Sequence, residues 1–500
     1  MIASITSPRR AWSVLATGVL ALGGIPAGTA PAQGRLILAG ATLIDGTGAA
    51  PLPDARIVIE DGRFTCVSGP GGCDPRPGDQ VLRLAGRWVT PGLIDTHIHL
   101  LYGDADDAVL ARAQRLRFAL GITTTRDAGS PAVTRLLALR DTAADANLPV
   151  PRLSVAARVS IENAERFGVP VGESLARHLI ALGVDAIKLK PPFGDDIWLG
   201  EIRAAREADV PVFGHTWAEP PRGPFAREAA AAGLSGVSHL LGLVMEMQPP
   251  GTDLTIPAGT EAEAWAWLRS LWTTIDTAAM DRLIGDLVRA GVWIEPTLAH
   301  EYHWGRSLPR HEHLRFLDPP ARLSDVLPLR RASTASREPR YPDTFDRQQA
   351  FVRTFAERGG MLVTGSDGVD AGLDLHEEIR LIAEATGDPM TGLLAATRNA
   401  ALAIGREDLG TIVPGSVADL VVHEVDPLAT PGATTHVVYV IKGGVLHAGG
   451  DLVSEFRSSY AEAVRETWFR ALRRWLPPLA LLVAVGIVGV ILLRRRRAAS

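Results

Sequence analysis

Short runs of apolar residues alternate with amphipathic stretches along most of this chain. Eight apolar runs predict buried strands, which end near His99, Thr125, Val159, Lys190, His215, His239, Thr297 and Asp367. Amphipathic stretches that predict helices follow most of them, for example 108–120, 173–182, 281–290, 348–358 and 376–385. This alternation predicts an α/β domain over residues 88–405, built as a (β/α)8 barrel with insertions after His239 and Tyr302.

Patterns of short strands flank this region on both sides. Residues 33–87 contain RLILAGATLIDG and ARIVIEDGRFTCV, in which Asp61-Gly62 is a hairpin signal. Residues 406–450 contain SVADLVVHEVDP and HVVYVIKGGVLHAG. We expect the two pieces to pair as one small β-sandwich, so that the chain enters and leaves the barrel through it.

The N-terminal residues 1–32 have the three parts of a secretory signal. Arg9 and Arg10 precede an apolar stretch, and small residues follow up to Ala32, where cleavage is expected. An uncleaved membrane anchor is the alternative.

The C-terminal residues predict a membrane anchor. An amphipathic helix over 451–475 leads to residues 476–493, which carry no charge and would rise about 27 Å as a helix. The basic tail 494–500 should stay in the cytoplasm, which leaves an exported, membrane-anchored protein with its body outside the cytoplasm. A sorting tail that is later removed is the alternative.

Charge and cysteine content restrict the remaining classes. The net charge is −5 although six arginines lie in the two terminal segments, so the body is acidic and no nucleic-acid partner is expected. The two cysteines, Cys66 and Cys73, are too few for a structural zinc site built on cysteine. In an exported protein they could form a disulfide or remain free thiols.

The first candidate for chemistry is the stretch TPGLIDTHIHL at residues 90–100. His97 and His99 are two apart on a strand, so both imidazoles lie on one side and can bind one metal ion. Such a pair is weak evidence alone, since two ordinary strand histidines would look the same.

Other predicted strand ends carry ligand-type residues too: Lys188 or Lys190, His215, His239 and Asp367. Each has a structural alternative, such as a hydrogen-bonded histidine or an aspartate that caps a helix. Because the carboxyl ends of barrel strands meet at one face, together they favour a common site.

In these motifs the chain resembles the amidohydrolase superfamily, in its imidazolonepropionase-like and prolidase-like branch. The resemblance covers about residues 35–449 and rests on VTPGLIDTHIHL, GITTTRDAG, GVDAIKLK, WIEPTL, VTGSDG, LLAATRNAALAIG and GTIVPGSVADLVV. It implies a distorted TIM barrel with a flanking β-sandwich and two divalent metal ions, usually Zn²⁺.

By the same resemblance, His97, His99 and Asp367 would hold one ion, and His215 and His239 the other. A carboxylated Lys188 would bridge them, with Lys190 as the alternative on the same strand face. Two adjacent ions would lower the pKa of a bridging water to give hydroxide, while Asp367 would act as general base and then general acid.

Substrate contacts are less well defined. His300, Tyr302 and His303 follow the seventh strand and could touch substrate or be solvated loop residues. The segment AARVSIENAERFG departs from the glycine- and histidine-rich loop of many relatives. Arg126 and Asp127 are expected to form a structural ion pair, with contact to a substrate carboxylate as the alternative.

The leading functional prediction is a hydrolase that cleaves the amide C–N bond of a small molecule, of the dipeptide or N-acyl amino acid type. The alternative within the fold is a cyclic amide hydrolase or heterocycle deaminase, although mononuclear deaminases generally lack the bridging lysine. A noncatalytic membrane-anchored binding or scaffold protein is the alternative of another class. The sequence does not determine the oligomeric state.

Overall fold

The computed structural model describes residues 34–101, 107–190, 194–216, 224–257, 261–304, 342–368, 372–429 and 432–449. The predicted signal 1–32, helix 451–475, span 476–493 and tail 494–500 lie outside these residues. Among the described helices, none is long and apolar enough to cross a bilayer.

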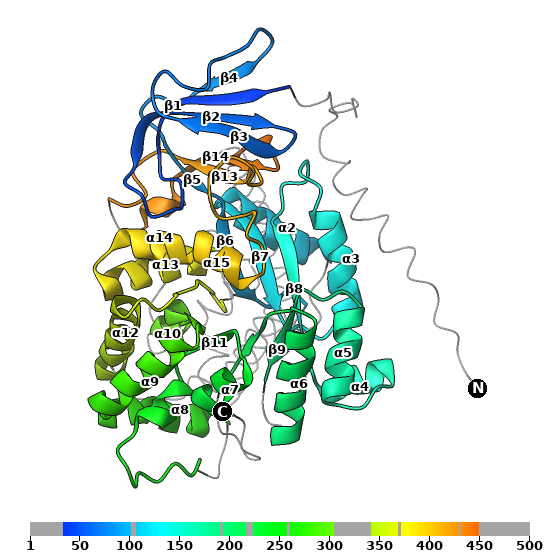
Figure 1. Cartoon of the computed structure of the whole chain (residues 1–500), viewed down its shortest axis with the longest axis vertical. Coiled ribbons are helices and arrows are strands. Elements are labelled where there is room, and N and C mark those ends of the chain that lie inside the picture. Colours follow the sequence, from blue (N-terminus) through cyan, green and yellow to red (C-terminus); the bar gives the residue numbers. More distant parts are fainter. Residues whose placement is uncertain are drawn as a thin grey trace, which may run out of the picture. The chain divides into compact units, whose positions relative to one another are not determined.

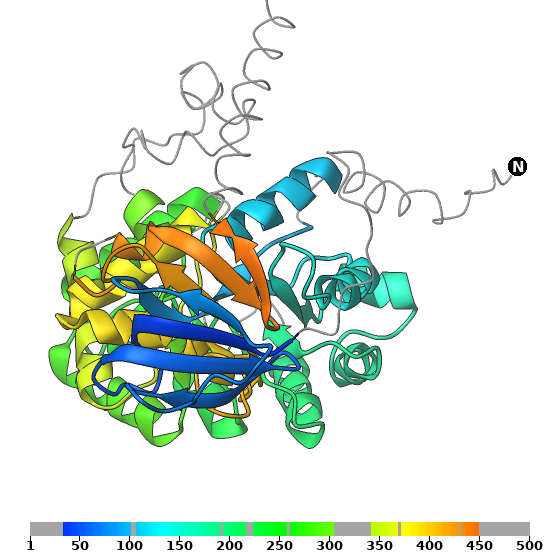
Figure 2. The ribbon, with the colours of Figure 1, turned by 90° about the horizontal axis from the view of Figure 1, so that it is seen from above.

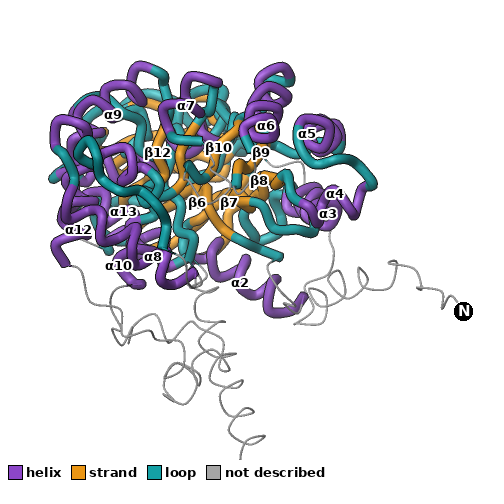
Figure 3. The backbone as a smooth tube through the Cα atoms, turned by 90° about the horizontal axis from the view of Figure 1, so that it is seen from below, coloured by secondary structure: helices purple, strands orange, loops and turns teal. Residues whose placement is uncertain are grey.

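Seven of the eight predicted barrel strands form one parallel sheet, which curls with helices outside it (Figure 3). Its order is β12-β11-β10-β9-β8-β7-β6. The strands are β6 (Leu93–Ile98), β7 (Ile122–Ala128), β8 (Arg152–Arg158), β9 (Ala186–Leu189), β10 (Val212–Gly214), β11 (Gly236–Ser238) and β12 (Trp293–Glu295).

The eighth predicted strand is a hydrogen-bonded segment rather than a regular strand. On one side, the Val363 amide donates to the Ile294 carbonyl of β12 at 2.9 Å. On the other, the Thr96 amide of β6 donates to the Thr364 carbonyl at 3.1 Å. Residues 361–367 therefore lie between the two edges of the curled sheet, and the segment brings Asp367 beside the end of β6.

Helices follow most of these strands and confirm the predicted alternation. They are α2 (Asp107–Ala119), α3 (Val133–Ala143), α4 (Ile161–Phe167), α5 (Glu173–Ala181), α6 (Asp195–Glu207), α7 (Ala226–Ala232), α8 (Glu261–Ser270), α9 (Thr277–Arg289), α10 (Leu298–Trp304), α12 (Pro342–Glu357), α13 (Leu373–Thr386), α14 (Pro389–Ala395) and α15 (Arg398–Ala403). Short 3-10 helices are η2 (Leu243–Met247), η3 (Leu271–Thr274) and η6 (Ala433–Thr435).

The flanking β-strands form one continuous mixed sheet of eight strands. They are β1 (Leu36–Leu43), β2 (Leu52–Glu60), β3 (Arg63–Ser68), β4 (Gln80–Arg83), β5 (Trp88–Pro91), β13 (Leu420–His423), β14 (Val437–Lys442) and β15 (Val445–Ala448). The blue and orange strands of Figures 1 and 2 show N- and C-terminal pieces side by side. The pieces pair as predicted, but through one sheet rather than two separate ones.

β5 joins the N-terminal strands of the mixed sheet to the C-terminal ones. The expected start of the barrel at Trp88 is therefore wrong. β5 pairs with β1 in parallel and with β13 antiparallel, so it belongs to the mixed sheet. Leu93 begins the first strand of the parallel sheet. Gly92 lies between the two sheets, and a Cβ there would come within 2.1 Å of the Thr123 hydroxyl.

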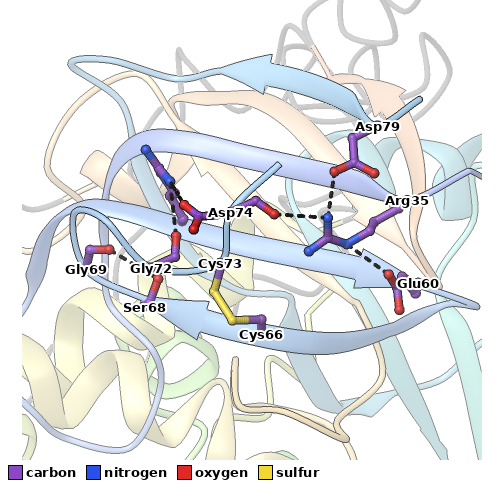
Figure 4. Close-up of a disulfide and its surroundings, with 10 residues drawn as sticks. Arg35, Glu60, Cys66, Ser68, Gly69, Gly72, Cys73, Asp74 and Asp79 are labelled. Atoms are coloured by element: carbon purple, nitrogen blue, oxygen red, sulfur yellow. Dashed lines mark hydrogen bonds and ion pairs between the residues drawn. A yellow bond between two sulfur atoms is a disulfide. The ribbon is translucent and has the colours of Figure 1, made fainter. Parts of the chain in front are cut away.

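The predicted hairpin and the possible disulfide are both present in the mixed sheet. Asp61 and Gly62 have φ of 48° and 75°, which suits the tight turn that joins β2 to β3. Cys66 of β3 is bonded to Cys73 across a Cα–Cα distance of 5.9 Å (Figure 4). Nearby, Arg35 forms ion pairs with Glu60 and Asp79.

Small and aromatic side chains form a buried cluster on one face of the parallel sheet. Ala128, Ala156 and Ala186 come from three neighbouring strands and share a buried cluster with Phe213 and Trp293. Side chains two residues further along each strand point the same way. The polar side chains at the carboxyl ends of these strands therefore lie on the same face of the sheet as the buried cluster.

Candidate metal centre

Three of the predicted ligands converge at the end of β6. The Nε2 atoms of His97 and His99 lie 3.7 and 3.3 Å from Asp367 Oδ1. One ligand atom from each of the three residues lies within 4.8 Å of the other two, so this cluster could hold a metal ion. The Asp367 amide donates to the His97 carbonyl at 2.8 Å, which fixes the carboxylate beside the histidines.

The second predicted histidine pair adjoins this cluster. The ring centroids of His215 and His239 are 4.7 Å apart, and that of His239 is 5.0 Å from His97. His239 Nε2 also lies 3.7 Å from Asp367 Oδ2. One carboxylate therefore faces histidines from both predicted pairs.

Hydrogen bonds orient two of these imidazoles for metal binding. The Thr297 hydroxyl donates to the Pro296 carbonyl and accepts from His239 Nδ1 at 2.8 Å. His97 Nδ1 donates to Glu295 at 2.7 Å. In both rings the proton is on Nδ1, which leaves the Nε2 lone pair directed at the Asp367 side of the site.

The backbone at the site is held in an uncommon conformation. His239, Thr297 and Asp367 have positive φ values of 66°, 49° and 41°. Non-glycine residues adopt this region at an energetic cost, and such residues cluster at functional sites. Gly365 permits the close approach of this segment, since a Cβ there would lie 2.6 Å from the side chains of both Glu295 and His97.

Lys188 projects into the same site. Its side chain is 1% exposed, its Nζ donates to the Ser238 hydroxyl at 3.0 Å, and the ammonium lies 4.8 Å from the centre of the Phe213 ring. Lys190 lies just past β9 and is exposed. The burial difference favours Lys188 over Lys190 as the lysine of the site.

Burial sets the protonation of these groups. It lowers the pKa of His97, His215 and His239, which favours the neutral imidazole that binds metals. Interactions with the surrounding histidines overcome burial at Asp367 and hold the pKa of its carboxyl well below its usual range. Neutral imidazoles around one carboxylate form a donor set that fits a divalent metal of the zinc type.

Glu295 is a site residue that the sequence prediction missed. It is 0% exposed and accepts hydrogen bonds from His97, from the Ser238 hydroxyl at 2.8 Å, from the Thr96 hydroxyl and from Arg126 at 3.2 Å. Ser238 in turn accepts from Lys188. Glu295 therefore connects His97 to Lys188 through hydrogen bonds. Its one sequence signal was an acidic residue at the end of the apolar strand in WIEPTL.

The predicted ion pair between Arg126 and Asp127 is wrong. Arg126 pairs with Glu295, and its guanidinium carbon lies 3.5 Å from the centre of the Phe213 ring. Asp127 instead accepts from the Leu100 amide at 2.8 Å and from the Ser130 amide and hydroxyl, each at 2.7 Å. Neighbouring strand residues point to opposite faces, which separates the two side chains.

Of the two predicted substrate contacts whose side chains the structure describes, His300 is the one close to the cluster. Its Nδ1 donates to the Asp367 carbonyl at 3.2 Å and lies 3.9 Å from Asp367 Oδ2. The Tyr302 ring packs against Phe345, with ring centroids 5.4 Å apart, and against Arg380. The side chain of His303 lies outside the described part of the chain.

Short segments of the chain match curated proteins. They are 38% identical over 96 residues to N-acyl-D-aspartate deacylase of Alcaligenes xylosoxydans xylosoxydans (19% of this chain, 18% of that protein). A second segment is 42% identical over 52 residues to imidazolonepropionase of Pseudomonas entomophila (10% of this chain, 13% of that protein). A longer segment is 28% identical over 217 residues to adenine deaminase of Rubrobacter xylanophilus (40% of this chain, 35% of that protein). Each match spans well under two thirds of the relative.

Solved structures resemble the chain over a much larger part of its length. A Xaa-Pro dipeptidase with bound methionine in its active site has a TM-score of 0.57 at 19% identity, over 83% of this chain and 100% of that one. Molinate hydrolase has a TM-score of 0.57 at 20% identity, over 84% and 96%. At such identities these structures establish a shared fold. The profile of the amidohydrolase family matches residues 88–447, and the chain belongs to that family.

Proposed function

We propose that this protein is a metal-dependent hydrolase that cleaves an amide C–N bond in a small molecule. The observation that carries the proposal is the position of Asp367, whose carboxylate oxygens lie 3.3 to 3.9 Å from nitrogens of four histidines. It is the one carboxylate of the described metal cluster.

His97, His99 and Asp367 would hold one divalent ion, and His215, His239 and a carboxylated Lys188 a second; zinc suits this donor set. Bound there, the ions would supply Lewis acidity that polarises a carbonyl and acidifies water. Asp367 would accept the proton of the attacking water and deliver it to the leaving nitrogen. His300, by donating to the Asp367 backbone, would help to keep that carboxylate in place.

Carboxylation of Lys188 is supported by its surroundings. Burial lowers the pKa of the Lys188 ammonium to about 7, so a neutral amine is present near neutral pH. The neutral amine can attack carbon dioxide, form an N–C bond and release a proton, which gives an anionic carbamate. The carbamate would present oxygen ligands where a free ammonium would repel a cation.

Replacing Lys188 with alanine should lower bound zinc from two ions per chain to one or fewer, as measured by elemental analysis after reconstitution with zinc and bicarbonate. In the wild type, uptake of the second ion should decline as the pH of reconstitution falls below about 7, because the protonated amine does not react with carbon dioxide. The matched variant Lys190→Ala should retain wild-type zinc. Loss of zinc in both variants would contradict the assignment to Lys188.

The preferred substrate class is a dipeptide or an N-acyl amino acid. It is supported by the fold shared with a Xaa-Pro dipeptidase and by the segment shared with N-acyl-D-aspartate deacylase. A library of both compound types, incubated with zinc-loaded protein, should release a primary or secondary amine with at least one member, and chelation should abolish release. No turnover of any member after zinc and bicarbonate loading would oppose the proposal.

Hydrolysis or deamination of a cyclic compound is the second candidate, favoured by the segments shared with adenine deaminase and imidazolonepropionase. Release of ammonia from adenine or ring opening of a cyclic amide, without turnover of linear amides, would support it. The noncatalytic scaffold alternative would require a disrupted ligand set, and the cluster of His97, His99 and Asp367 argues against it.

We further propose that the protein is exported and held to the membrane by residues 476–493. The Cys66–Cys73 disulfide supports export, because disulfides persist mainly in oxidising compartments. Fractionation of cells, with protease added to intact spheroplasts, tests both statements: the body should be degraded from outside and should sediment with membranes.

A further inference from the structure

Arg158 lies beside the site lysine without any assigned role. It ends β8 and is paired in register with Lys188 of β9. Arg158 follows Ala156 by two residues, as Lys188 follows Ala186, and both alanines belong to the buried cluster inside the sheet. Arg158 therefore projects from the same face as Lys188, toward the carboxyl-end side where the metal ligands gather.

Contacts at Gly129 support this direction. A Cβ at Gly129 would come within 2.6 Å of Arg158 Cγ and 3.5 Å of Lys188 Cβ, so the three residues adjoin one another. Gly129 also has a φ of 101°, a conformation that other residues rarely adopt. The glycine leaves room for the Arg158 side chain above the end of β7.

One guanidinium nitrogen of Arg158 has no partner within the described residues. The Arg158 Nε is buried without a hydrogen-bond acceptor. Arg126, from the neighbouring strand, has Glu295, the Thr96 carbonyl and the Ala403 carbonyl as acceptors. A partly buried cation with an unpaired Nε beside the proposed metal site is a candidate for binding an anionic ligand group.

We propose that Arg158 binds a carboxylate of the substrate, which restricts the substrate to amides that carry a free carboxylate, such as N-acyl amino acids and dipeptides. This rests on the proposed hydrolase function. Arginine presents two parallel N–H donors that match a carboxylate, whereas a C-terminal amide offers one oxygen and no charge. Lys190, exposed just past β9, adds positive charge on the same side.

The experiment compares N-acetyl amino acids with their C-terminal primary amides on the zinc-loaded full-length protein. Arg158→Met should raise KM for the N-acetyl amino acids by about 10- to 100-fold while kcat changes by less than about threefold, and hydrolysis of the amides should be unaffected. Arg158→Lys should have a KM for the N-acetyl amino acids between those of the wild type and Arg158→Met, since lysine retains the charge but not the paired donors. Arg166→Met is the matched control, because Arg166 is paired with Glu162 on α4.

Equal losses on acids and amides, or a loss of bound zinc in Arg158→Met, would overturn the proposal and assign Arg158 to the support of the metal site. If no compound is hydrolysed, the proposed hydrolase function fails, and the role of Arg158 is decided by calorimetry. N-acetylglycine should then bind the zinc-loaded protein more tightly than N-acetylglycinamide, with the difference lost in Arg158→Met. An unchanged difference in that variant would overturn the role by itself.

Discussion

Replacing Asp367 with asparagine is expected to lower kcat by about 100- to 10,000-fold even in excess zinc, which is the range for loss of a general acid–base group. Asparagine retains an oxygen of similar position but accepts no proton near neutral pH. Steady-state kinetics on the best amide substrate, with zinc content measured on the same sample, separates loss of proton transfer from loss of metal.

The matched control is Asp196→Asn, since Asp196 is exposed in the first turn of α6 and is none of the predicted ligands. It should retain wild-type turnover. Full activity in Asp367→Asn with zinc bound would rule out the proton-transfer role, whereas activity lost only in proportion to lost zinc would reduce Asp367 to a metal ligand.

Replacing Glu295 with glutamine is expected to have the second largest effect, on both metal binding and stability. The carboxylate orients His97 directly and Lys188 through Ser238, so zinc affinity should fall by about 10- to 100-fold. Buried Arg126 would lose its charge partner, which should lower the free energy of unfolding by about 3 kcal/mol. Chelator competition measures the first effect and urea denaturation of metal-free protein the second.

Glu207→Gln is the control for the loss of one carboxylate charge. Glu207, the last residue of α6, forms an exposed ion pair with Arg177 of α5. Exposed pairs contribute little to stability. It should leave both zinc affinity and the urea midpoint unchanged. A folded Glu295→Gln protein with wild-type zinc affinity would show that His97 needs no carboxylate to hold its orientation.

The strands, the hairpin and the positions of most candidate ligands were predictable because they depend on local patterns. Alternation and turn residues placed the ends of β6, β10 and β11 correctly, and with them His97, His215 and His239. The common face of the strand ends then brought these residues together by geometry alone. The eighth strand was predicted as regular, whereas the structure has a segment bent close to Glu295 and His97.

Partner choice was decided only by the tertiary structure, since it depends on residues far apart in the chain. Lys188 and Lys190 have the same local pattern. Lys188 is buried and donates a hydrogen bond to Ser238, whereas Lys190 is exposed. Arg126 stands next to Asp127, yet its carboxylate partner is Glu295 from β12. Residues 88–91 were predicted as the start of the barrel, but β5 belongs to the mixed sheet because it pairs with β1 and β13. Local pattern thus determined which segments become strands and which residues end them, whereas long-range packing determined which charges are buried and what neutralises them.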